Sequence, residues 1–373
     1  MKKKMIAAGH ICVDITPAIP GKKVTKINEL MIPGKLIEVG DATVSTGGAV
    51  ANTGLAMKVL GANVSLMGKI GNDAFGGIVK SVLKKYGAED ELLISDTEGT
   101  SYTLVVAVPG IDRIFLHNPG ANNSFCTEDI PVEELKDAAL FHFGYPTIMR
   151  SMYLNDGEEL VKMMKMVKEA GVATSMDLAS VDEASEAATV DWHLVLERVM
   201  PYIDIFVPSV EELCYMLDKE RFQEWQKRAA GKDITEVLDI EKDVKPLAQE
   251  CMKLGAKILL LKCGVPGMYF CSADKETLSQ ISDRLELDVD AWAGKEYFEK
   301  SYVPERVLSG TGAGDTSIAA FLTAMTDGYT PEDALHLAAG TGASCVTAYD
   351  ALSGLKSFEE LKKKINAGWE KVN

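Results

Sequence analysis

The sequence Gly-Thr-Gly-Ala-Gly-Asp occupies residues 310–315, between an extended apolar segment at 302–308 and an apolar helical run at 316–325. Glycine has no Cβ, so a ligand can approach the backbone of such a turn closely. The first amides of a helix have no partner within the helix and carry partial positive charge. This pattern therefore predicts that an anion such as phosphate binds where the helix begins.

Asp315 allows two interpretations of this turn. A carboxylate beside bound phosphate is electrostatically unfavourable, so its presence indicates a base that accepts a proton from an attacking hydroxyl. Alternatively, the glycines only form a turn, and the carboxylate stabilises the N-terminus of the following helix. The segment alone favours neither interpretation.

A second glycine-rich segment, residues 46–56, reads Thr-Gly-Gly-Ala-Val-Ala-Asn-Thr-Gly-Leu-Ala and again leads into a predicted helix. Its small residues allow that helix to pack closely against a neighbour. Asn52 interrupts the otherwise apolar face, and a buried side-chain amide needs hydrogen-bond partners. Asn52 is therefore either a core residue satisfied by its neighbours or a group that binds a hydroxyl at the floor of a pocket.

The composition limits the classes of function. A chain of 373 residues with 47% hydrophobic and 25% charged residues can bury one large core. The net charge of −16 argues against a nucleic-acid partner, because no basic stripe could replace phosphate counterions. No apolar run approaches the roughly 18 residues of a membrane helix. The seven cysteines include no CxxC pair, which favours reduced thiols and a cytoplasmic protein.

Apolar β-rich segments alternate with helical patterns along the chain. The β-rich segments are residues 5–9, 64–68, 138–143, 172–177, 203–207 and 258–262. The helical patterns are residues 49–60, 74–86, 157–170, 210–217, 244–254 and 331–348. This alternation predicts an α/β fold, in which helices cover both faces of a mostly parallel sheet. Ligands of such folds bind outside the carboxyl ends of the strands.

Two stretches, residues 21–41 and 100–118, lack a helical period and mix β-branched residues with glycine and proline. They predict antiparallel strands outside the main sheet, in a small β lid contributed by about residues 15–45 and 97–120. Such a lid has exposed strand edges that another subunit can cover. A homodimer formed through the lid is therefore expected.

Two further stretches look inserted. Residues 218–245 are dense in charge and indicate a solvated helical excursion, and residues 282–300 are acidic with aromatic interruptions. Surface decoration is the favoured interpretation of both. The chain as a whole, residues 1–373, is expected to form one large α/β domain.

Together, the two glycine-rich segments resemble the two signatures of the PfkB/ribokinase-type carbohydrate kinase family. The first signature extends from Gly47 through Gly-Lys-Ile-Gly-Asn-Asp at residues 68–73 to Gly76, and the second is residues 311–315. The opening sequence Gly-His-Ile-Cys-Val-Asp, residues 9–14, also matches the family's first strand. The resemblance therefore spans nearly the whole chain.

This resemblance implies a ribokinase-like fold and ATP-dependent phosphorylation of a hydroxyl on a small sugar or sugar acid, with Mg²⁺ as cofactor. Asp315 would be the general base, and the amides of Gly312, Ala313 and Gly314 the anion hole. The implied substrate-binding residues are Asp14, Gly47, Gly48, Asn52 and Arg113. The implied nucleotide-binding residues are Ser209, Lys262, Gly264, Gly267 and Thr311, and Glu212 would act on Mg²⁺.

Four of these residues have simpler interpretations. Asp14 can cap a turn, and Arg113 can pair with Asp112 on the surface. Lys262 can end a buried strand in solvent, and Glu212 can be a solvated glutamate on a helix face. The sequence leaves these alternatives open.

Departures from the family pattern leave the substrate open. Ser309-Gly310-Thr311 stands where many members have Asp-Thr-Thr, so a requirement for K⁺ stays undecided. Ser209 replaces the usual asparagine of the Pro-Asn-x-x-Glu motif, and only Asp177 is kept from an Asp-x-Asn-x-Arg pattern. A nucleoside kinase is one alternative, and a catalytically silent regulator that binds a sugar or nucleotide is another. The aromatic candidates for a nucleobase pocket are Tyr102, Phe115, Phe141, Phe143 and Tyr145.

Overall fold

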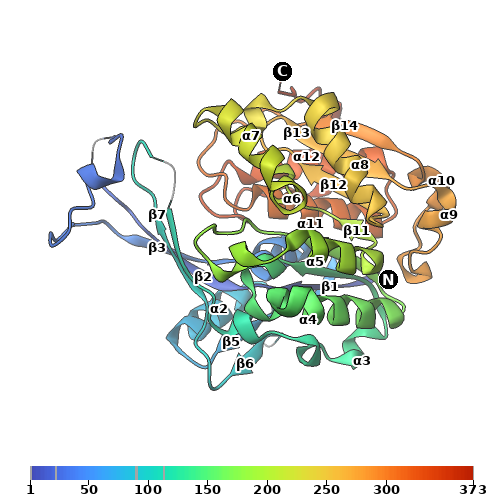
Figure 1. The fold of residues 1–373 in the computed structure, drawn as a ribbon, viewed down its shortest axis with the longest axis horizontal. Coiled ribbons are helices and arrows are strands. Elements are labelled where there is room, and N and C mark those ends of the chain that lie inside the picture. The colour runs from blue at the N-terminus through green and yellow to red at the C-terminus, as the bar shows by residue number, and fades with distance from the viewer. Residues whose placement is uncertain (1, 22, 89–90, 112–113, 373) are drawn as a thin grey trace.

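Among the described residues, eight strands form the main sheet, in the order β14-β13-β12-β11-β10-β9-β1-β4 (Figure 1). The computed structural model describes residues 2–21, 23–88, 91–111 and 114–372. The strands are β1 Lys4–Gly9, β4 Asn63–Met67, β9 Ala138–Gly144, β10 Ala173–Asp177, β11 Ile205–Phe206, β12 Ile258–Lys262, β13 Gly267–Ser272 and β14 Glu296–Lys300. Pairing is parallel from β4 to β12, and β13 and β14 are antiparallel. The predicted mostly parallel α/β sheet is confirmed.

Helices cover both faces of this sheet because its strands are apolar on both sides. In β1, Met5 and Ala7 belong to one buried cluster, whereas Ile6 and Ala8 belong to the other. The first cluster contains side chains of α1 Leu55–Val59, α2 Ala74–Lys84, α9 Lys275–Leu278, α10 Val289–Trp292, α11 Ala313–Thr326, α12 Pro331–Cys345 and α13 Phe358–Asn366. The second contains side chains of α3 Val132–Leu135, α4 Arg150–Glu169, α5 Trp192–Val199, α6 Val210–Leu217, α7 Lys219–Ala229 and α8 Lys245–Lys253. No helix of the described residues is long and apolar enough to cross a membrane.

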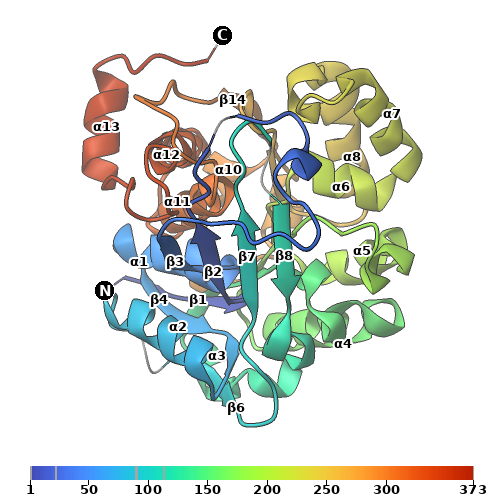
Figure 2. The same ribbon diagram turned by 90° about the vertical axis from the view of Figure 1, so that its left-hand side faces the viewer.

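A second sheet of four strands projects to one side of the main body (Figures 1 and 2). Its order is β3-β2-β7-β8, with β2 Cys12–Pro17, β3 Ala42–Gly47, β7 Tyr102–Val106 and β8 Ile114–Asn118. A short parallel pair, β5 Lys69–Gly71 and β6 Leu93–Ser95, lies apart from both sheets. We call the four-stranded sheet the small sheet.

The antiparallel pair expected within residues 100–118 is β7 and β8. The prediction of strands within residues 21–41 is wrong, because the described residues of that stretch contain only a short helical turn, Ile27–Glu29. The strands β2 and β3 instead flank this stretch and pair with each other. Pro33 and Gly34 lie in a turn, and proline cannot donate to a strand ladder.

The interpretation of residues 282–300 as surface decoration is also wrong, whereas residues 218–245 contain a mostly exposed helix, α7, as predicted. Residues 282–300 end in β14, which pairs with β13 at the edge of the main sheet. Trp292, from the same stretch, is buried against α11 through its edge-on contact with Phe321. In the other stretch, α7 buries Trp225. One large aromatic side chain in each stretch supplies enough apolar area to anchor a mostly charged segment.

Candidate active site

The turn at residues 310–315 leads directly into α11. Gly312 is the N-cap residue, with a φ of +76°. A Cβ at this position would overlap the side chain of Ala351, so both the backbone angle and the packing require glycine. The amide of Ala313 donates to the carbonyl of Gly310 at 3.3 Å, and the amide of Thr311 donates to Ser309 Oγ at 3.1 Å. The predicted glycine turn before a helix is therefore present.

Asp315 lies in the first turn of α11 with only 6% of its surface exposed. The side-chain amide of Asn52 donates to its Oδ2 at 3.0 Å. The hydroxyl of Tyr145 donates to its Oδ1 at 2.6 Å. The fold thus brings the two glycine-rich segments together at one carboxylate, and Asn52 is a satisfied residue that also lines a cavity.

The larger of two cavities has a volume of about 720 Å³ and lies where the small sheet meets the main sheet. Its wall includes the sequence-predicted residues Asp14, Gly48, Asn52, Thr311, Gly312 and Asp315. The small sheet contributes Cys12, Asp14, Thr103, Phe115 and His117 to the same wall. Phe141 and Phe143, suggested as nucleobase contacts, are fully buried in the core instead.

Asp14 is held inside β2 and faces this cavity, so it does not cap a turn. The thiol of Cys12 donates to its Oδ1 at 3.3 Å. Burial raises the pKa of Asp14, and repulsion by Asp315 adds to the rise, whereas hydrogen bonds from Cys12 and Thr103 oppose it. A Cβ at Gly47 would overlap the Asp14 carboxylate, and one at Gly48 would overlap His10. The absence of a Cβ at Gly47 and Gly48 therefore leaves room for the side chains of Asp14 and His10.

The smaller cavity, of about 330 Å³, adjoins the first, because Tyr145, Glu212 and Asp315 line both. Its wall includes the predicted nucleotide-side residues Ser209, Glu212, Lys262, Gly264 and Gly314. The charged stretch after α6 adds Asp233 and Thr235. Its acidic side chains are Asp177, Glu211, Glu212, Asp233 and Asp315.

The ammonium group of Lys262 is not exposed to solvent, in contrast to one of the two interpretations of this residue. Its ammonium donates to Asp177 Oδ1 at 2.7 Å, and its side chain is 14% exposed. Burial raises the pKa of Asp177 to about 8, although attraction to Lys262 opposes that rise. The other oxygen of Asp177 is buried and has no hydrogen-bond partner among the described residues. This ion pair lies beside Gly314, so the one lysine among the described residues of the smaller cavity wall is close to the helix start.

Ser209 and Glu212 form a capping box at the start of α6. The Glu212 carboxylate accepts from the Ser209 amide at 2.8 Å, and Ser209 Oγ accepts from the Glu212 amide at 3.2 Å. Serine is as good an N-cap as asparagine, so the substitution keeps the local structure of the motif. Glu212 is partly buried between the cavities and is not a freely solvated side chain.

Three predicted site residues, Gly47, Gly267 and Ala313, are not among the described residues that line either cavity. Gly267 begins β13, where a Cβ would overlap the carbonyl of Glu299 in β14, so glycine permits this strand pairing. Arg113 lies outside the described residues.

Sequence reasoning did not identify Tyr145 as a partner of Asp315, or Asp233 and Thr235 as cavity residues. Tyr145 directly follows the buried strand β9, and a polar side chain at the carboxyl end of a parallel strand is a usable signal. Asp233 and Thr235 lie in a stretch whose high charge suggested only solvent exposure.

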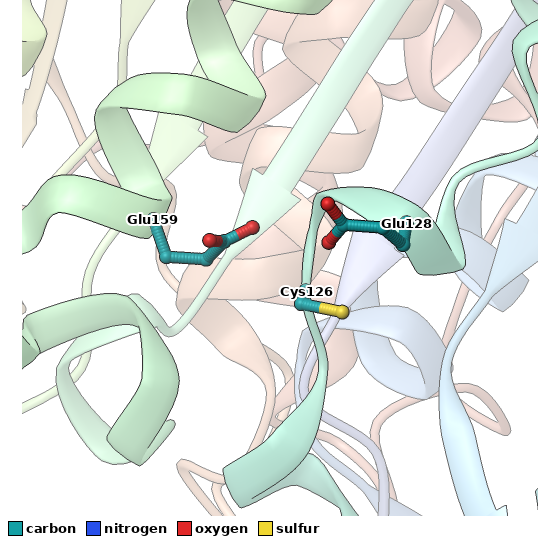
Figure 3. A group of neighbouring side chains, drawn as sticks. All are labelled: Cys126, Glu128 and Glu159. Atoms are coloured by element: carbon teal, nitrogen blue, oxygen red, sulfur yellow. The ribbon is translucent and has the colours of Figure 1, made fainter.

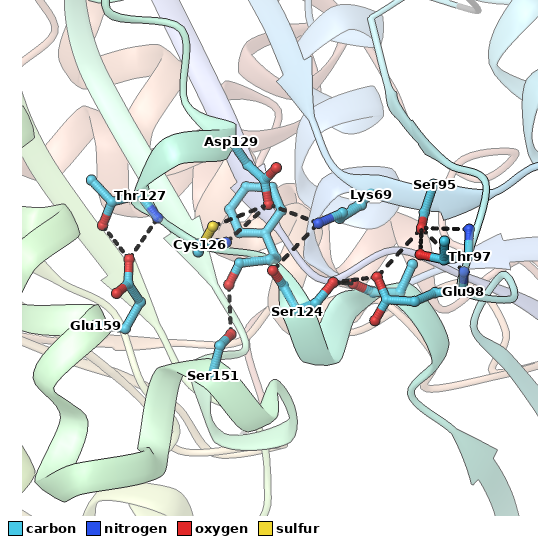
Figure 4. Close-up of polar contacts among 12 residues, drawn as sticks. Lys69, Ser95, Thr97, Glu98, Ser124, Cys126, Thr127, Asp129, Ser151 and Glu159 are labelled. Carbon is cyan, nitrogen blue, oxygen red and sulfur yellow. Dashed lines mark hydrogen bonds and ion pairs between the residues drawn. The ribbon is translucent and has the colours of Figure 1, made fainter.

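One further group of potential metal ligands lies away from both cavities. Atoms of Cys126, Glu128 and Glu159 come within 4.8 Å of one another (Figure 3). Glu159 already accepts from the amide and hydroxyl of Thr127 at 2.7 and 2.5 Å (Figure 4), and Lys162 pairs with Glu128 at 2.5 Å. These carboxylates therefore tie α4 to the helical turn Thr127–Asp129, and we assign no metal to them.

Comparison with known proteins decides the family. Residues 8–357 match the model of the pfkB family of carbohydrate kinases. The chain belongs to this family.

Among solved structures similar to this pfkB-family protein, a ribokinase from Giardia lamblia has a TM-score of 0.71 and 16% identity, covering 98% of this chain and 99% of that one. A fructokinase from Xylella fastidiosa with bound ATP has a TM-score of 0.70 and 19% identity, covering 98% and 99%. The predicted ribokinase-like fold is confirmed.

Curated relatives of this pfkB-family protein include sugar kinases. Fructokinase-1 of Zea mays is 26% identical over 183 residues, which are 47% of this chain and 51% of that protein. The chain thus spans about half the length of this plant relative. An uncharacterized sugar kinase of Archaeoglobus fulgidus is 23% identical over 303 residues, which are 81% of this chain and 98% of that protein.

Proposed function

We propose that this pfkB-family protein is an ATP-dependent phosphotransferase that acts on a hydroxyl of a sugar or sugar acid. The observation that carries this proposal is the position of Asp315, which lines both cavities at the N-terminus of α11. The larger cavity would hold the hydroxyl compound, and the smaller one the phosphates of the nucleotide. The similarity to a fructokinase with bound ATP supports the same class of reaction.

Asp315 would act as the base of this reaction. The acceptor oxygen bonds to the γ-phosphorus, the bond from that phosphorus to the leaving oxygen of ADP breaks, and Asp315 takes the hydroxyl proton. Phosphoryl transfer has a loose transition state in most analyses, so a carboxylate that is well aligned suffices. Most of the acceleration would come from positioning and from amides at the helix start, which face the transferred group. We assign this anion hole to Gly312, Ala313 and Gly314, with Ala313 contributing once its bond to Gly310 opens.

The smaller cavity fits nucleotide phosphates only together with a divalent cation. Lys262 is its single lysine, whereas Asp177, Glu211 and Glu212 are acidic. Burial, with repulsion by Asp233, raises the pKa of Glu211 to about 7, which reflects this negative surrounding. Mg²⁺ prefers oxygen ligands and shares them with phosphates. Glu212 and the unpartnered oxygen of Asp177 would hold Mg²⁺, which neutralises phosphate charge, and Ser209, Gly264 and Thr311 would contact the nucleotide.

The larger cavity suits a polyol. The Asp14 carboxylate can accept hydrogen bonds from two neighbouring hydroxyls, and Asn52, which donates to Asp315, lines the same cavity. Gly47 and Gly48 would let the sugar approach the backbone. We further propose that the small sheet acts as a lid, because its closure would exclude water that competes for the phosphoryl group.

A substrate panel tests the function. The purified protein is mixed with Mg²⁺-ATP and single sugars, sugar acids or nucleosides, with and without K⁺, and ADP formation is measured. We expect turnover with at least one sugar or sugar acid that carries neighbouring hydroxyls. A deoxy analogue that lacks one of the two hydroxyls bound by Asp14 should lose about 10–100-fold in kcat/KM, since hydrogen bonds to charged groups contribute about 1.5–3 kcal/mol.

Other outcomes of this panel point to the rival functions. Turnover confined to nucleosides would favour a nucleoside kinase, for which the neighbouring rings of His10, His117 and Tyr145 offer aromatic contacts. Thermal stabilisation by a sugar or nucleotide without any ADP formation would favour a silent binding protein. Either result would contradict the proposed sugar kinase.

We also propose a homodimer formed through the small sheet. Its edge strand β8 is exposed along its whole length, including the apolar side chains of Ile114, Phe115 and Leu116. Exposed apolar strand edges are favourable sites for pairing with a second chain. Size-exclusion chromatography with light scattering should give twice the 40.4 kDa of one chain. A Leu116→Lys variant should dissociate, and a monomeric wild-type protein would contradict the proposal.

A further inference from the structure

Tyr145 has an unusual backbone conformation directly after β9. Its φ of +69° and ψ of +40° lie in the left-handed region, which costs a non-glycine residue about 1–2 kcal/mol. The flanking residues explain how it persists. Gly144 packs so closely on Ala49 that a Cβ would overlap it, and Thr147 Oγ1 donates to the carbonyl of Ala179 at 2.7 Å. The turn is therefore fixed from both sides.

This conformation places the Tyr145 side chain in the wall shared by the two cavities. Its hydroxyl donates to Asp315 Oδ1 at 2.6 Å, a length typical of a strong hydrogen bond from a hydroxyl to a carboxylate. Asn52 holds the other oxygen of Asp315 at 3.0 Å. One carboxylate is thus oriented by two donors that come from separate parts of the chain.

The Tyr145 hydroxyl stays a donor throughout the physiological pH range. Burial raises the pKa of Tyr145 well above its ordinary value, and repulsion by Asp315 and Asp177 adds to the rise. Charged side chains near this pair are Asp14, Asp177, Glu212 and Lys262. Three of the four are acidic, so the carboxylate of Asp315 depends on neutral donors for stabilisation of its charge.

We propose that Tyr145 is a positioning residue for Asp315: it fixes the orientation of the carboxylate and stabilises its ionised form where the two cavities meet. This inference rests on the proposed function, in which Asp315 takes the proton of the acceptor hydroxyl. A carboxylate oxygen has two lone-pair directions, so Oδ1 can accept from Tyr145 and still face the acceptor. The strained turn at Tyr145 is then a feature of the site, because it aims this one hydroxyl.

The test is a Tyr145→Phe variant, which removes one oxygen atom and keeps the ring. The kcat should fall about 10–100-fold, since a hydrogen bond to a charged group is lost and the base is less well aligned. The KM for ATP should change less than about twofold, because Tyr145 acts through Asp315. A wild-type kcat in this variant would overturn the inference.

Two further measurements separate this inference from a general structural effect and from failure of the proposed function. Tyr302→Phe, which removes the hydroxyl of a buried tyrosine stacked on Trp369, is the matched control and should leave kcat unchanged. Carboxyl-labelled aspartate NMR tests the contact without any turnover. The carboxyl resonance that is missing in Asp315→Asn should have a different chemical shift in Tyr145→Phe than in wild type, because its hydrogen bond from Tyr145 is lost. If the substrate panel fails but this shift occurs, the proposed function is wrong and the positioning contact stands, whereas no shift overturns the contact itself.

Discussion

Replacing Asp315 by asparagine is expected to lower kcat by about 10²–10⁴-fold, the usual contribution of a general base. Asparagine has nearly the same shape, and its side-chain oxygen can still accept the hydrogen bond from Tyr145. It cannot take the proton of an acceptor hydroxyl. The change should be measured as ADP formation with whichever sugar the panel identifies.

ATP binding and folding provide the controls for this variant. Calorimetric titration of Mg²⁺-ATP should give an affinity within a few-fold of wild type or somewhat tighter, since a negative charge beside the phosphates has been removed. The melting temperature shows whether the variant is folded. A folded variant that binds ATP and turns over at the wild-type rate would eliminate Asp315 as the base.

Replacing Asp204 by alanine is expected to destabilise the protein by about 3–5 kcal/mol, as loss of one partner from a buried ion pair commonly does. Asp204 precedes β11 and is fully buried. It pairs with the ammonium of Lys257 at 3.0 Å and with that of Lys168, and it accepts the amide of Thr174 at 3.1 Å. Without it, a lysine that is 6% exposed has lost its counter-charge in the interior.

Urea unfolding followed by tryptophan fluorescence measures this effect as a lower midpoint at similar slope. Asp137→Ala is the matched control, because Asp137 also pairs with a lysine, Lys4, but is exposed to solvent. Exposed pairs contribute little, so this curve should nearly superpose on that of wild type. Equal midpoints for Asp204→Ala and Asp137→Ala would show that the buried network does not stabilise the fold.

The parts of the fold that the sequence predicted correctly are those set by local pattern. The strand at 258–262 was predicted with its observed limits, because it is continuously apolar as a strand buried on both faces must be. The helix after Gly312 was predicted because the left-handed N-cap glycine and the following apolar run are neighbours in sequence. The strands sought within 21–41 and the role of 282–300 were missed, because the pairing of an edge strand depends on distant partners and not on its own composition.

Among the candidate site residues, too, some predictions agree with the structure and others do not. The two glycine-rich segments indicated Asn52 and Asp315, the resemblance at residues 9–14 implied Asp14, and the structure brings all three to one cavity. Gly267, by contrast, matched a nucleotide-side pattern but serves the pairing of two strands. A glycine pattern shows that backbone approaches something closely, and it does not show whether that neighbour is a ligand or another strand.

By itself the sequence determined where helices begin, which faces are apolar and where glycine turns precede a helix, since these properties depend on a few adjacent residues. Only the tertiary structure decided that Tyr145 and Asn52, 170 and 263 residues away along the chain, both hold Asp315. The reason is physical: the order of strands in the main sheet and the left-handed turn after β9 set these distances, and neither leaves a periodic signal in the chain.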